Sequence, residues 1–216
     1  MEAPRLERKL VAILAADVEG YSRHMERDEA ATLATLSAHR AIVDELINSH
    51  NGRITGTAGD SVLAEFPSVV EAVDCAVKIQ DALAATNEDF PDEHRLQFRI
   101  GINVGDVMVK DGDIFGDGVN IAARLENLAT PGGISISRGV RDHVRKLGRF
   151  AFEDLGEQAS RTSNSRFAPF GCAAWMPRQR QVRRWRRLFR GHPTMAPPTG
   201  LPCSTKPVLP MKPSWS

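Results

Sequence analysis

Cysteine is scarce in this chain of 216 residues, and acidic residues are missing from its C-terminal part. The three cysteines, Cys75, Cys172 and Cys203, have neither paired nor metal-binding spacing, which argues against a disulfide framework or a zinc site. No apolar run approaches the roughly 18 residues of a membrane span, and no secretory signal is recognisable. We therefore expect a protein that works in the cytoplasm.

Charge divides the chain into two parts. The first 157 residues carry all 27 acidic residues but only 17 of the 28 basic ones. From Gln158 onward there are nine Arg, two Lys, all three Trp and nine of the thirteen Pro. Such a shift predicts a folded domain at residues 6–157 and a tail at residues 158–216. The Arg, Pro and Ser content of the tail is typical of disorder.

The hydrophobic pattern of the first part alternates between strand and helix signals. Asp28 and Ser68 are placed to cap two long helices, and Asn51-Gly52 ends the first of them. The order strand–helix–strand–strand–helix–strand predicts an α+β fold with a ferredoxin-like βαββαβ core and extra elements. We expect an antiparallel or mixed sheet with one face covered by helices. The expected strands are 10–18, 53–57, 61–66, 96–104, 106–110, 133–137 and 149–154, with shorter helices at 117–128 and 138–147.

Two aspartates stand at the ends of expected strands. Asp17 ends the apolar run Leu10–Val18, where a carboxylate is costly unless it is paired. Asp60 lies in the turn between two short strands. Together they could hold Mg²⁺, which prefers a few carboxylates plus substrate phosphates. The alternative is that Asp17 caps a helix and Asp60 only shapes a turn.

Three motifs in the chain resemble those of class III adenylate and guanylate cyclases. Residues 113–126 read DIFGDGVNIAARLE, which is similar to the signature of that family. The segments ILAADVEGYS, at 13–22, and AGDSVLAEF, at 58–66, are similar to its two metal-binding segments. The resemblance runs from Arg8 to Gly156 in family order and implies the class III nucleotide cyclase fold.

An asparagine and an arginine stand out in the third motif. Asn120 and Arg124 are four residues apart, so a helix presents them on one face. Arg124 offers a rigid donor fork that suits phosphate oxygens. The resemblance implies that this catalytic pair orients the ribose and stabilises the transition state. Without a site, Arg124 would pair on the surface with Glu126 or Glu157.

The resemblance also implies a metal site and an activity. Asp17 and Asp60, with the Val18 carbonyl, would ligate two Mg²⁺ or Mn²⁺ ions, and Asp113 would read the purine edge. The implied reaction is attack of the ribose 3′-hydroxyl of ATP on its α-phosphate, giving 3′,5′-cyclic AMP and pyrophosphate for signalling. In this family each site combines residues of two subunits, so we expect a head-to-tail homodimer.

Two departures from the family pattern leave alternatives open. Gly56 occupies a substrate-binding position where many adenylate cyclases carry a purine-contacting Lys, so GTP is a possible substrate and guanylate cyclase an alternative function. After Glu157 the family continues with a phosphate-contacting Lys and a closing strand, and neither is recognisable. A catalytically impaired nucleotide-binding or dimerisation module is therefore the second alternative. A diguanylate-forming or polymerase-like enzyme would be expected to have a different second metal turn.

The tail contains a basic cluster at residues 178–190, RQRQVRRWRRLFR. Basic residues interleaved with Trp185, Leu188 and Phe189 are typical of a nucleic-acid or membrane-surface patch. Out-of-frame translation of GC-rich DNA also produces Arg- and Pro-rich sequence. We therefore expect neither a nucleic acid nor a membrane partner.

We predict that the tail arises from a frameshift near Gln158. One set of standard codons for Ala159–Cys172, read one nucleotide earlier, gives VKNIEFPVRAFRV, which supplies both the lysine and an alternating closing strand. Sequencing the coding DNA across Gln158 tests this prediction. A gene in which no shifted frame encodes that strand contradicts it.

Overall fold

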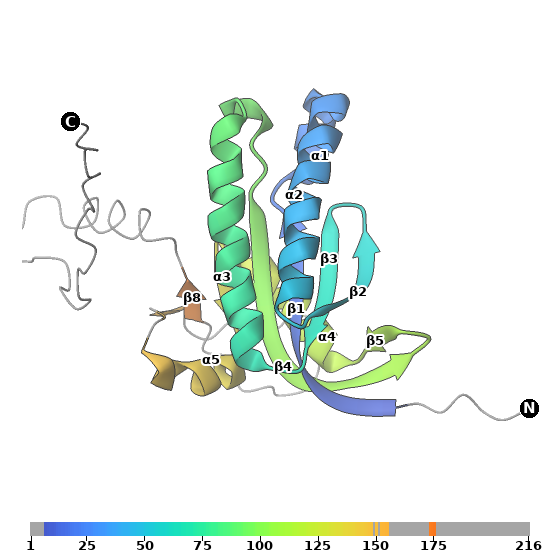
Figure 1. Cartoon of the computed structure of the whole chain (residues 1–216), viewed down its shortest axis with the longest axis vertical. Coiled ribbons are helices and arrows are strands. Elements are labelled where there is room, and N and C mark those ends of the chain that lie inside the picture. Colours follow the sequence, from blue (N-terminus) through green and yellow to red (C-terminus); the bar gives the residue numbers. More distant parts are fainter. Residues whose placement is uncertain (1–6, 149, 151, 156–172, 176–216) are drawn as a thin grey trace, which may run out of the picture. The chain divides into compact units, whose positions relative to one another are not determined.

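The computed structural model describes residues 7–148, 150, 152–155 and 173–175 (Figure 1). They belong to one compact unit, Met1–Pro177, and a second unit, Arg178–Ser216, lies outside the described residues. Short 3₁₀ turns occur at Asn87–Asp89, Asp92–His94 and Arg145–Leu147. The helices and strands are β1 (Glu7–Val18), α1 (Tyr21–Arg27), α2 (Glu29–Ser49), β2 (Arg53–Ala58), β3 (Ser61–Phe66), α3 (Val69–Thr86), β4 (Phe98–Lys110), β5 (Asp113–Phe115), α4 (Asp117–Leu128), β6 (Ile134–Ile136), α5 (Arg138–Val144), β7 (Glu153–Asp154) and β8 (Ala173–Trp175).

The strands form one mixed sheet in the order β2-β3-β1-β4-β6-β8-β7, and β5 pairs with the end of β4. β1 runs antiparallel to both β3 and β4, whereas β4 and β6 run parallel. The four strands of the expected ferredoxin-like core, β2, β3, β1 and β4, are neighbours. The α+β prediction is therefore confirmed, with β5 to β8 as extra elements.

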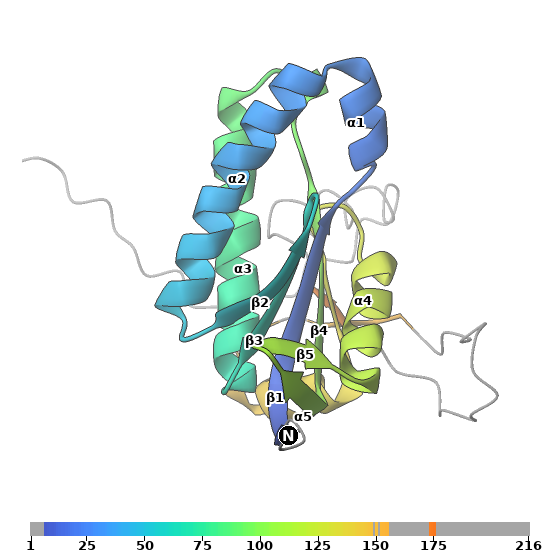
Figure 2. The ribbon, with the colours of Figure 1, turned by 90° about the vertical axis from the view of Figure 1, so that its right-hand side faces the viewer.

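Helices cover both faces of the sheet, not one as expected. Ala12, Leu14 and Ala16 of β1 pack into a core shared with α2, α3 and α5. The alternating residues Val11 and Ile13 pack toward Ala122 of α4. Figure 2 shows α4 on the side of the sheet opposite α2 and α3. This burial explains the unbroken apolar run in β1, because a strand buried on both faces needs apolar residues at every position.

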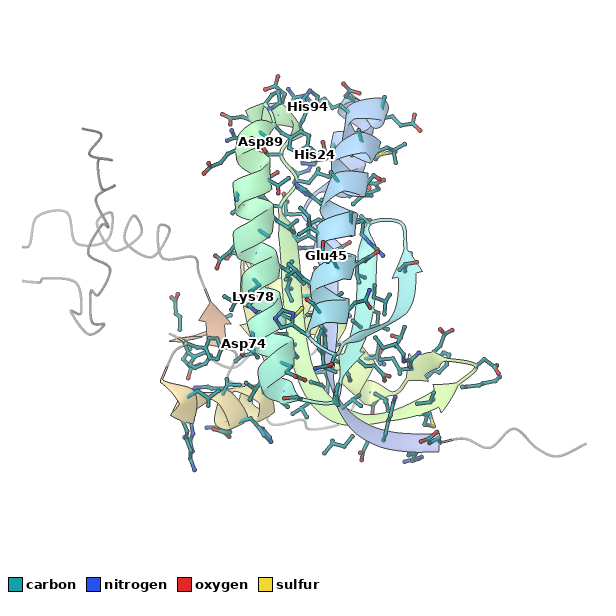
Figure 3. The ribbon with its side chains drawn as sticks, viewed as in Figure 1. His24, Glu45, Asp74, Lys78, Asp89 and His94 are labelled. Carbon is teal, nitrogen blue, oxygen red and sulfur yellow. The ribbon has the colours of Figure 1, made fainter. Side chains whose placement is uncertain are left out.

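The two long helices begin at the expected caps. The Ala31 N–H donates to the Asp28 side chain (3.0 Å) and the Glu71 N–H to Ser68 Oγ (3.4 Å). Their outer surface carries charged side chains, as Figure 3 shows for Glu45. Helix α1 was not expected from the sequence. It has no side-chain cap and none of its residues is buried, so the sequence shows no helical spacing of apolar residues there.

Several boundaries differ from those expected. The strands predicted on either side of Gly105 form one continuous strand, β4, because Gly105 stays in register opposite Val11 of β1. The expected helix 138–147 changes to a 3₁₀ turn after Val144. Among the described residues of the expected strand 149–154, namely 150 and 152–154, only Glu153–Asp154 is strand.

One short strand lies within the segment that we expected to be a tail. β8 pairs antiparallel with β6 and with β7. The expectation that no strand follows β7 is therefore wrong for these three residues. A free strand edge exposes backbone groups that any extended segment can satisfy, whatever its side chains. The remainder of residues 158–216 lies outside the described residues.

In the part of the chain that the structure describes, no helix combines the length and the apolar character needed to cross a membrane.

Helix α4 lies directly on the backbone of β4. A Cβ atom added to Gly101 would be 2.2 Å from the Ala122 carbonyl oxygen and 2.2 Å from the Glu126 nitrogen. Two residues further along β4, Asn103 Nδ2 donates to the Gly118 carbonyl in the first turn of α4 (3.1 Å). The absence of a side chain at Gly101 therefore sets how close α4 comes to the sheet.

We predict that Gly101→Ala destabilises the protein by about 1–3 kcal/mol, because the added methyl group forces α4 away from β4. Urea denaturation measures the free energy of unfolding. Gly56→Ala is the matched control: its Cβ would meet Leu63 no closer than 3.8 Å. We expect the control to change stability by about 0.5 kcal/mol or less. Equal effects of the two substitutions would contradict the close approach of α4.

Candidate functional site

The fold brings Asp17 and Asp60 together. β1 and β3 are antiparallel, with Ala16 opposite Val62, so the end of β1 lies beside the turn that precedes β3. The Val18 N–H donates to Asp60 Oδ2 (3.1 Å), and Ser61 Oγ donates to Asp17 Oδ1 (3.0 Å). The two carboxyl groups thus come from segments 43 residues apart in sequence and are both fixed by neighbouring donors.

The closeness of these two groups changes how Asp60 titrates. Burial, followed by the hydrogen bond and the like charge of Asp17, raises the pKa of the Asp60 carboxyl from 3.8 to about 6. Backbone N–H groups of Asp60 and Val18 act in the opposite direction but are weaker. Two adjacent carboxylates repel each other unless a proton or a cation lies between them.

Arg99 of β4 provides a positive charge beside the pair. It stands opposite Asp17 in the β1–β4 register, and its Nη2 lies 3.3 Å from Asp17 Oδ2. The same Nη2 lies 3.0 Å from Glu126 Oε1 of α4. The sequence interpretation missed Arg99. The signal was available, because an arginine inside the apolar strand Phe98–Ile102 must be paired.

Glu126 differs most from what the sequence suggested. It was considered a surface partner of Arg124, but it is only 6% exposed and forms its ion pair with Arg99. Burial raises the pKa of the Glu126 carboxyl to about 7; Arg99 lowers it, and the charges of Asp17 and Asp60 raise it further. The surface assignment is wrong because position 126 falls on the side of α4 that packs on the sheet.

The asparagine–arginine pair lies on the opposite side of α4. Asn120 and Arg124 are both exposed, whereas Ala122 and Leu125 between and beside them are buried. Asn120 and Arg124 therefore share one face of the helix, as predicted, and that face is exposed to solvent. The predicted metal-binding and catalytic residues therefore form two groups, one at the end of β1 and one on the outer face of α4.

Asp113 and Gly56, the residues expected near the purine, lie on β5 and β2. Asp113 is exposed, and Gly56 lies at a register shift between β2 and β3. A Cβ at Gly56 would meet only Leu63, at ordinary contact distance, so the position has room for a side chain. Arg53 Nη1 donates to the Gly112 carbonyl (2.6 Å) and links β2 to the turn before β5.

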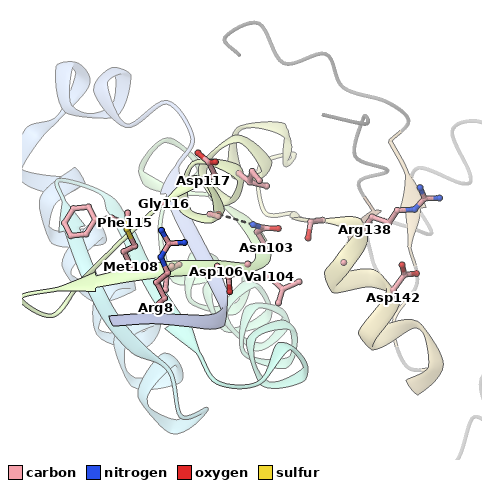
Figure 4. Close-up of a pocket in the computed structure, with 16 residues that line it drawn as sticks. Arg8, Asn103, Val104, Asp106, Met108, Phe115, Gly116, Asp117, Arg138 and Asp142 are labelled. Atoms are coloured by element: carbon pink, nitrogen blue, oxygen red, sulfur yellow. Dashed lines mark hydrogen bonds between the residues drawn. The ribbon is translucent and has the colours of Figure 1, made fainter. Parts of the chain in front are cut away.

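A cavity of about 800 Å³ lies between β4 and the first turns of α4 and α5 (Figure 4). Asn103, Asp106, Asp117 and Arg138 contribute to its lining, and Figure 4 shows the hydrogen bond from Asn103 to Gly118. None of the predicted site residues lines this cavity.

The donor set at Asp17 and Asp60 fits a divalent cation that also binds substrate. Among the residues that the structure describes, no group of three or more His, Cys, Asp or Glu could hold a metal ion without other ligands. Two carboxylates with an incomplete shell are what Mg²⁺ uses when phosphate oxygens complete its coordination. The raised Asp60 pKa is a second indication, since a cation would relieve the repulsion that causes part of it.

Comparison with known proteins relates this geometry to a family. The sequence profile of the adenylate and guanylate cyclase catalytic domain matches residues 4–166. "Putative adenylate cyclase 3" of Rhizobium meliloti (strain 1021) is 40% identical over 215 residues, which cover 99% of this chain. The chain spans 34% of the length of that relative. The match extends beyond residue 157, and the coding DNA decides whether the tail is read in frame.

Solved structures agree on the fold. An adenylate/guanylate cyclase/hydrolase from Silicibacter pomeroyi is 42% identical with a TM-score of 0.74, covering 80% of this chain and 99% of that one. The adenylyl cyclase CyaB from P. aeruginosa is 20% identical with a TM-score of 0.69, covering 80% and 96% of the two chains. At that identity the second likeness concerns the fold alone.

We predict that Asp60→Asn stabilises the metal-free protein at pH 8. The raised pKa means that ionised Asp60 opposes folding, so wild-type stability falls as the pH rises from about 4 through about 6. The amide carries no charge and its oxygen can still accept from Val18. With allowance for solvent screening, we expect a gain of about 1–2 kcal/mol at pH 8 and little gain at pH 4.

Urea denaturation in the presence of a chelator, at both pH values, measures this difference. Asp89→Asn is the control, because it makes the same atomic change at an exposed position (Figure 3). A loss of stability at pH 8 in Asp60→Asn would contradict the repulsion between the two carboxylates.

Proposed function

The chain belongs to the family of adenylate and guanylate cyclase catalytic domains, and we propose that it converts ATP to 3′,5′-cyclic AMP and pyrophosphate. The observation that carries the proposal is the placement of Asp17 and Asp60 side by side, fixed by Val18 and Ser61. A pair of adjacent, partly exposed carboxylates is suited to a nucleoside triphosphate with its cations. The product would act in intracellular signalling. The reaction would take place in the cytoplasm.

In the proposed reaction the ribose 3′-hydroxyl attacks the α-phosphate in line, and pyrophosphate leaves. Two Mg²⁺ or Mn²⁺ ions, held by Asp17, Asp60 and the Val18 carbonyl, would lower the pKa of the attacking hydroxyl and neutralise charge on the phosphates. Arg99 lies next to Asp17 and would add a positive charge near the substrate phosphates. The protein contributes mainly positioning and charge neutralisation.

The reaction as proposed needs a second copy of the chain. Asn120 and Arg124 lie on the outer, exposed face of α4, while the carboxylate pair lies at the end of β1. In a head-to-tail homodimer the Asn–Arg pair of each subunit would complete the site of its partner. A two-fold axis makes the two sites equivalent. There Asn120 would orient the ribose, and Arg124 would bind the oxygens of the α-phosphate in the transition state.

Guanylate cyclase activity is the closest alternative, and Gly56 leaves it open. Strong selection between purines requires buried polar groups that pair with one base and not with the other. Gly56 has no side chain, so among the positions considered Asp113 alone would read the base edge through a side chain. Parallel assays with ATP and GTP at saturating Mn²⁺ distinguish the two functions, and a larger kcat/KM for GTP would overturn the adenylate assignment.

A nucleotide-binding or dimerisation module without catalysis is the other alternative. The missing lysine after Glu157 favours it, because that position would otherwise neutralise phosphate charge. A folded dimer that binds ATP with Mn²⁺ but releases no cyclic nucleotide or pyrophosphate would support this alternative against the enzyme.

We predict that Asp17→Ala and Asn120→Ala each abolish activity in a homodimer. Activity should return in a heterodimer of one Asp17→Ala subunit and one Asn120→Ala subunit. In a heterodimer purified through two different tags, one site lacks both residues and the other is intact. We expect about half of the wild-type activity per dimer, because one of two equivalent sites remains. Cyclic AMP formation with Mn²⁺-ATP measures it. Heterodimers as inactive as both parents would contradict the shared site, whereas activity in either homodimer would contradict the residue's role.

A further inference from the structure

Arg99 is shared between two carboxylates by a single nitrogen atom. Its Nη2 lies 3.3 Å from Asp17 Oδ2 and 3.0 Å from Glu126 Oε1. The shorter contact lacks hydrogen-bond alignment. Arg99 Nε and Glu126 Oε1 have no hydrogen-bond partner among the described residues, although both are buried. The guanidinium therefore donates a single hydrogen bond to Asp17 and forms an ion pair with Glu126, while its Nε has no partner among the described residues.

The position of Glu126 is set by the sheet. Its backbone nitrogen and Cα lie against Gly101, where no side chain separates α4 from β4. Gly101 is two residues from Arg99 and shares its face of β4, because side chains alternate along a strand. The carboxylate of Glu126 is thus held close to Arg99 by the packing of α4 on β4.

The charges explain what this arrangement can do. A guanidinium beside Asp17 competes with a cation for the same carboxylate oxygens, since both are positive partners. A second carboxylate on the other side of Arg99 shares its charge and weakens that competition. Partners in the second shell of a metal site tune its ligands in this way.

We propose that Glu126 is a positioning residue for the metal-binding half of the site in its own subunit, and that it acts through Arg99. It keeps Arg99 from pairing fully with Asp17 and so leaves that carboxylate available to the cation. The inference rests on the proposed function. α4 then serves two sites: Glu126 acts on the site of its own subunit, while Asn120 and Arg124 reach the site of the partner.

The first test measures direct binding of Mn²⁺ to the protein without nucleotide. Electron paramagnetic resonance reports the concentration of the free ion during the titration. Glu126→Gln keeps the shape of the side chain and removes its charge. We expect the dissociation constant for Mn²⁺ to rise about tenfold, which is typical when a residue that orients a metal ligand is changed. Glu45→Gln, an exposed position on α2, is the control and leaves binding unchanged. Unchanged binding in Glu126→Gln would overturn the proposal.

The second test asks whether Glu126 acts through Arg99. In an Arg99→Met background, Glu126→Gln should no longer alter Mn²⁺ binding, because the residue that it positions is gone. A tenfold weakening that persists in this background would show a direct charge effect and overturn the proposed route. Arg99→Met alone leaves Glu126 buried without its partner, whereas the double variant does not. Thermal unfolding of all four proteins checks that each is folded.

The third test identifies which half of the site Glu126 serves. In a tagged heterodimer of Glu126→Gln with Asn120→Ala, the intact site uses the metal-binding half of the Asn120→Ala subunit. Its activity should show the wild-type requirement for Mn²⁺. In a heterodimer with Asp17→Ala, the complete site uses the metal-binding half of the Glu126→Gln subunit, so the requirement should stay raised. The reverse pattern, or equal requirements, would overturn the proposal.

The heterodimer of Asp17→Ala with Asn120→Ala distinguishes a failure of the proposed two-subunit site from a failure of the role of Glu126. If that pair fails to restore activity, the proposed two-subunit site fails. If it restores activity and the Glu126→Gln heterodimers do not differ, only the role of Glu126 fails.

Discussion

Two carboxylates held side by side are the constraint on which the rest of this molecule depends. Asp17 and Asp60 come from distant parts of the chain, and their hydrogen bonds with Ser61 and Val18 keep them adjacent. Burial, followed by the hydrogen bond and the like charge of Asp17, raises the pKa of the Asp60 carboxyl, so ionising both carboxyl groups costs free energy in the absence of a cation. In the proposed function this cost is offset, because the carboxylate pair would become favourable when cations bind with the substrate.

Helix α4 connects this constraint to the rest of the fold. Its inner face lies on β4 at Gly101, so Glu126 is buried next to Arg99 and, through it, next to Asp17. Its outer face presents Asn120 and Arg124 to solvent. A small shift of this helix would therefore alter both groups at once. The close packing of helix on strand, with no side chain between them, restricts such shifts.

Local signals predicted most elements of the fold. The caps Asp28 and Ser68 and the strands on either side of the turn at Gly59-Asp60 follow from hydrogen-bonding and turn chemistry within a few residues. The prediction failed where an element has no such signal. Helix α1 has no capping side chain and no buried residue, and β8 is defined by its pairing with β6 and β7.

The sequence by itself predicted which residues would carry the chemistry, because the motifs around Asp17, Asp60 and Asn120 resemble those of one family. It also determined that Asn120 and Arg124 share a helical face, since four residues make about one turn. Only the tertiary structure decided that Arg99 and Glu126 join the carboxylate pair. Their contact depends on the register between β1 and β4 and on the absence of a side chain at Gly101. Register and close approach are properties of paired segments, and neither segment carries them alone.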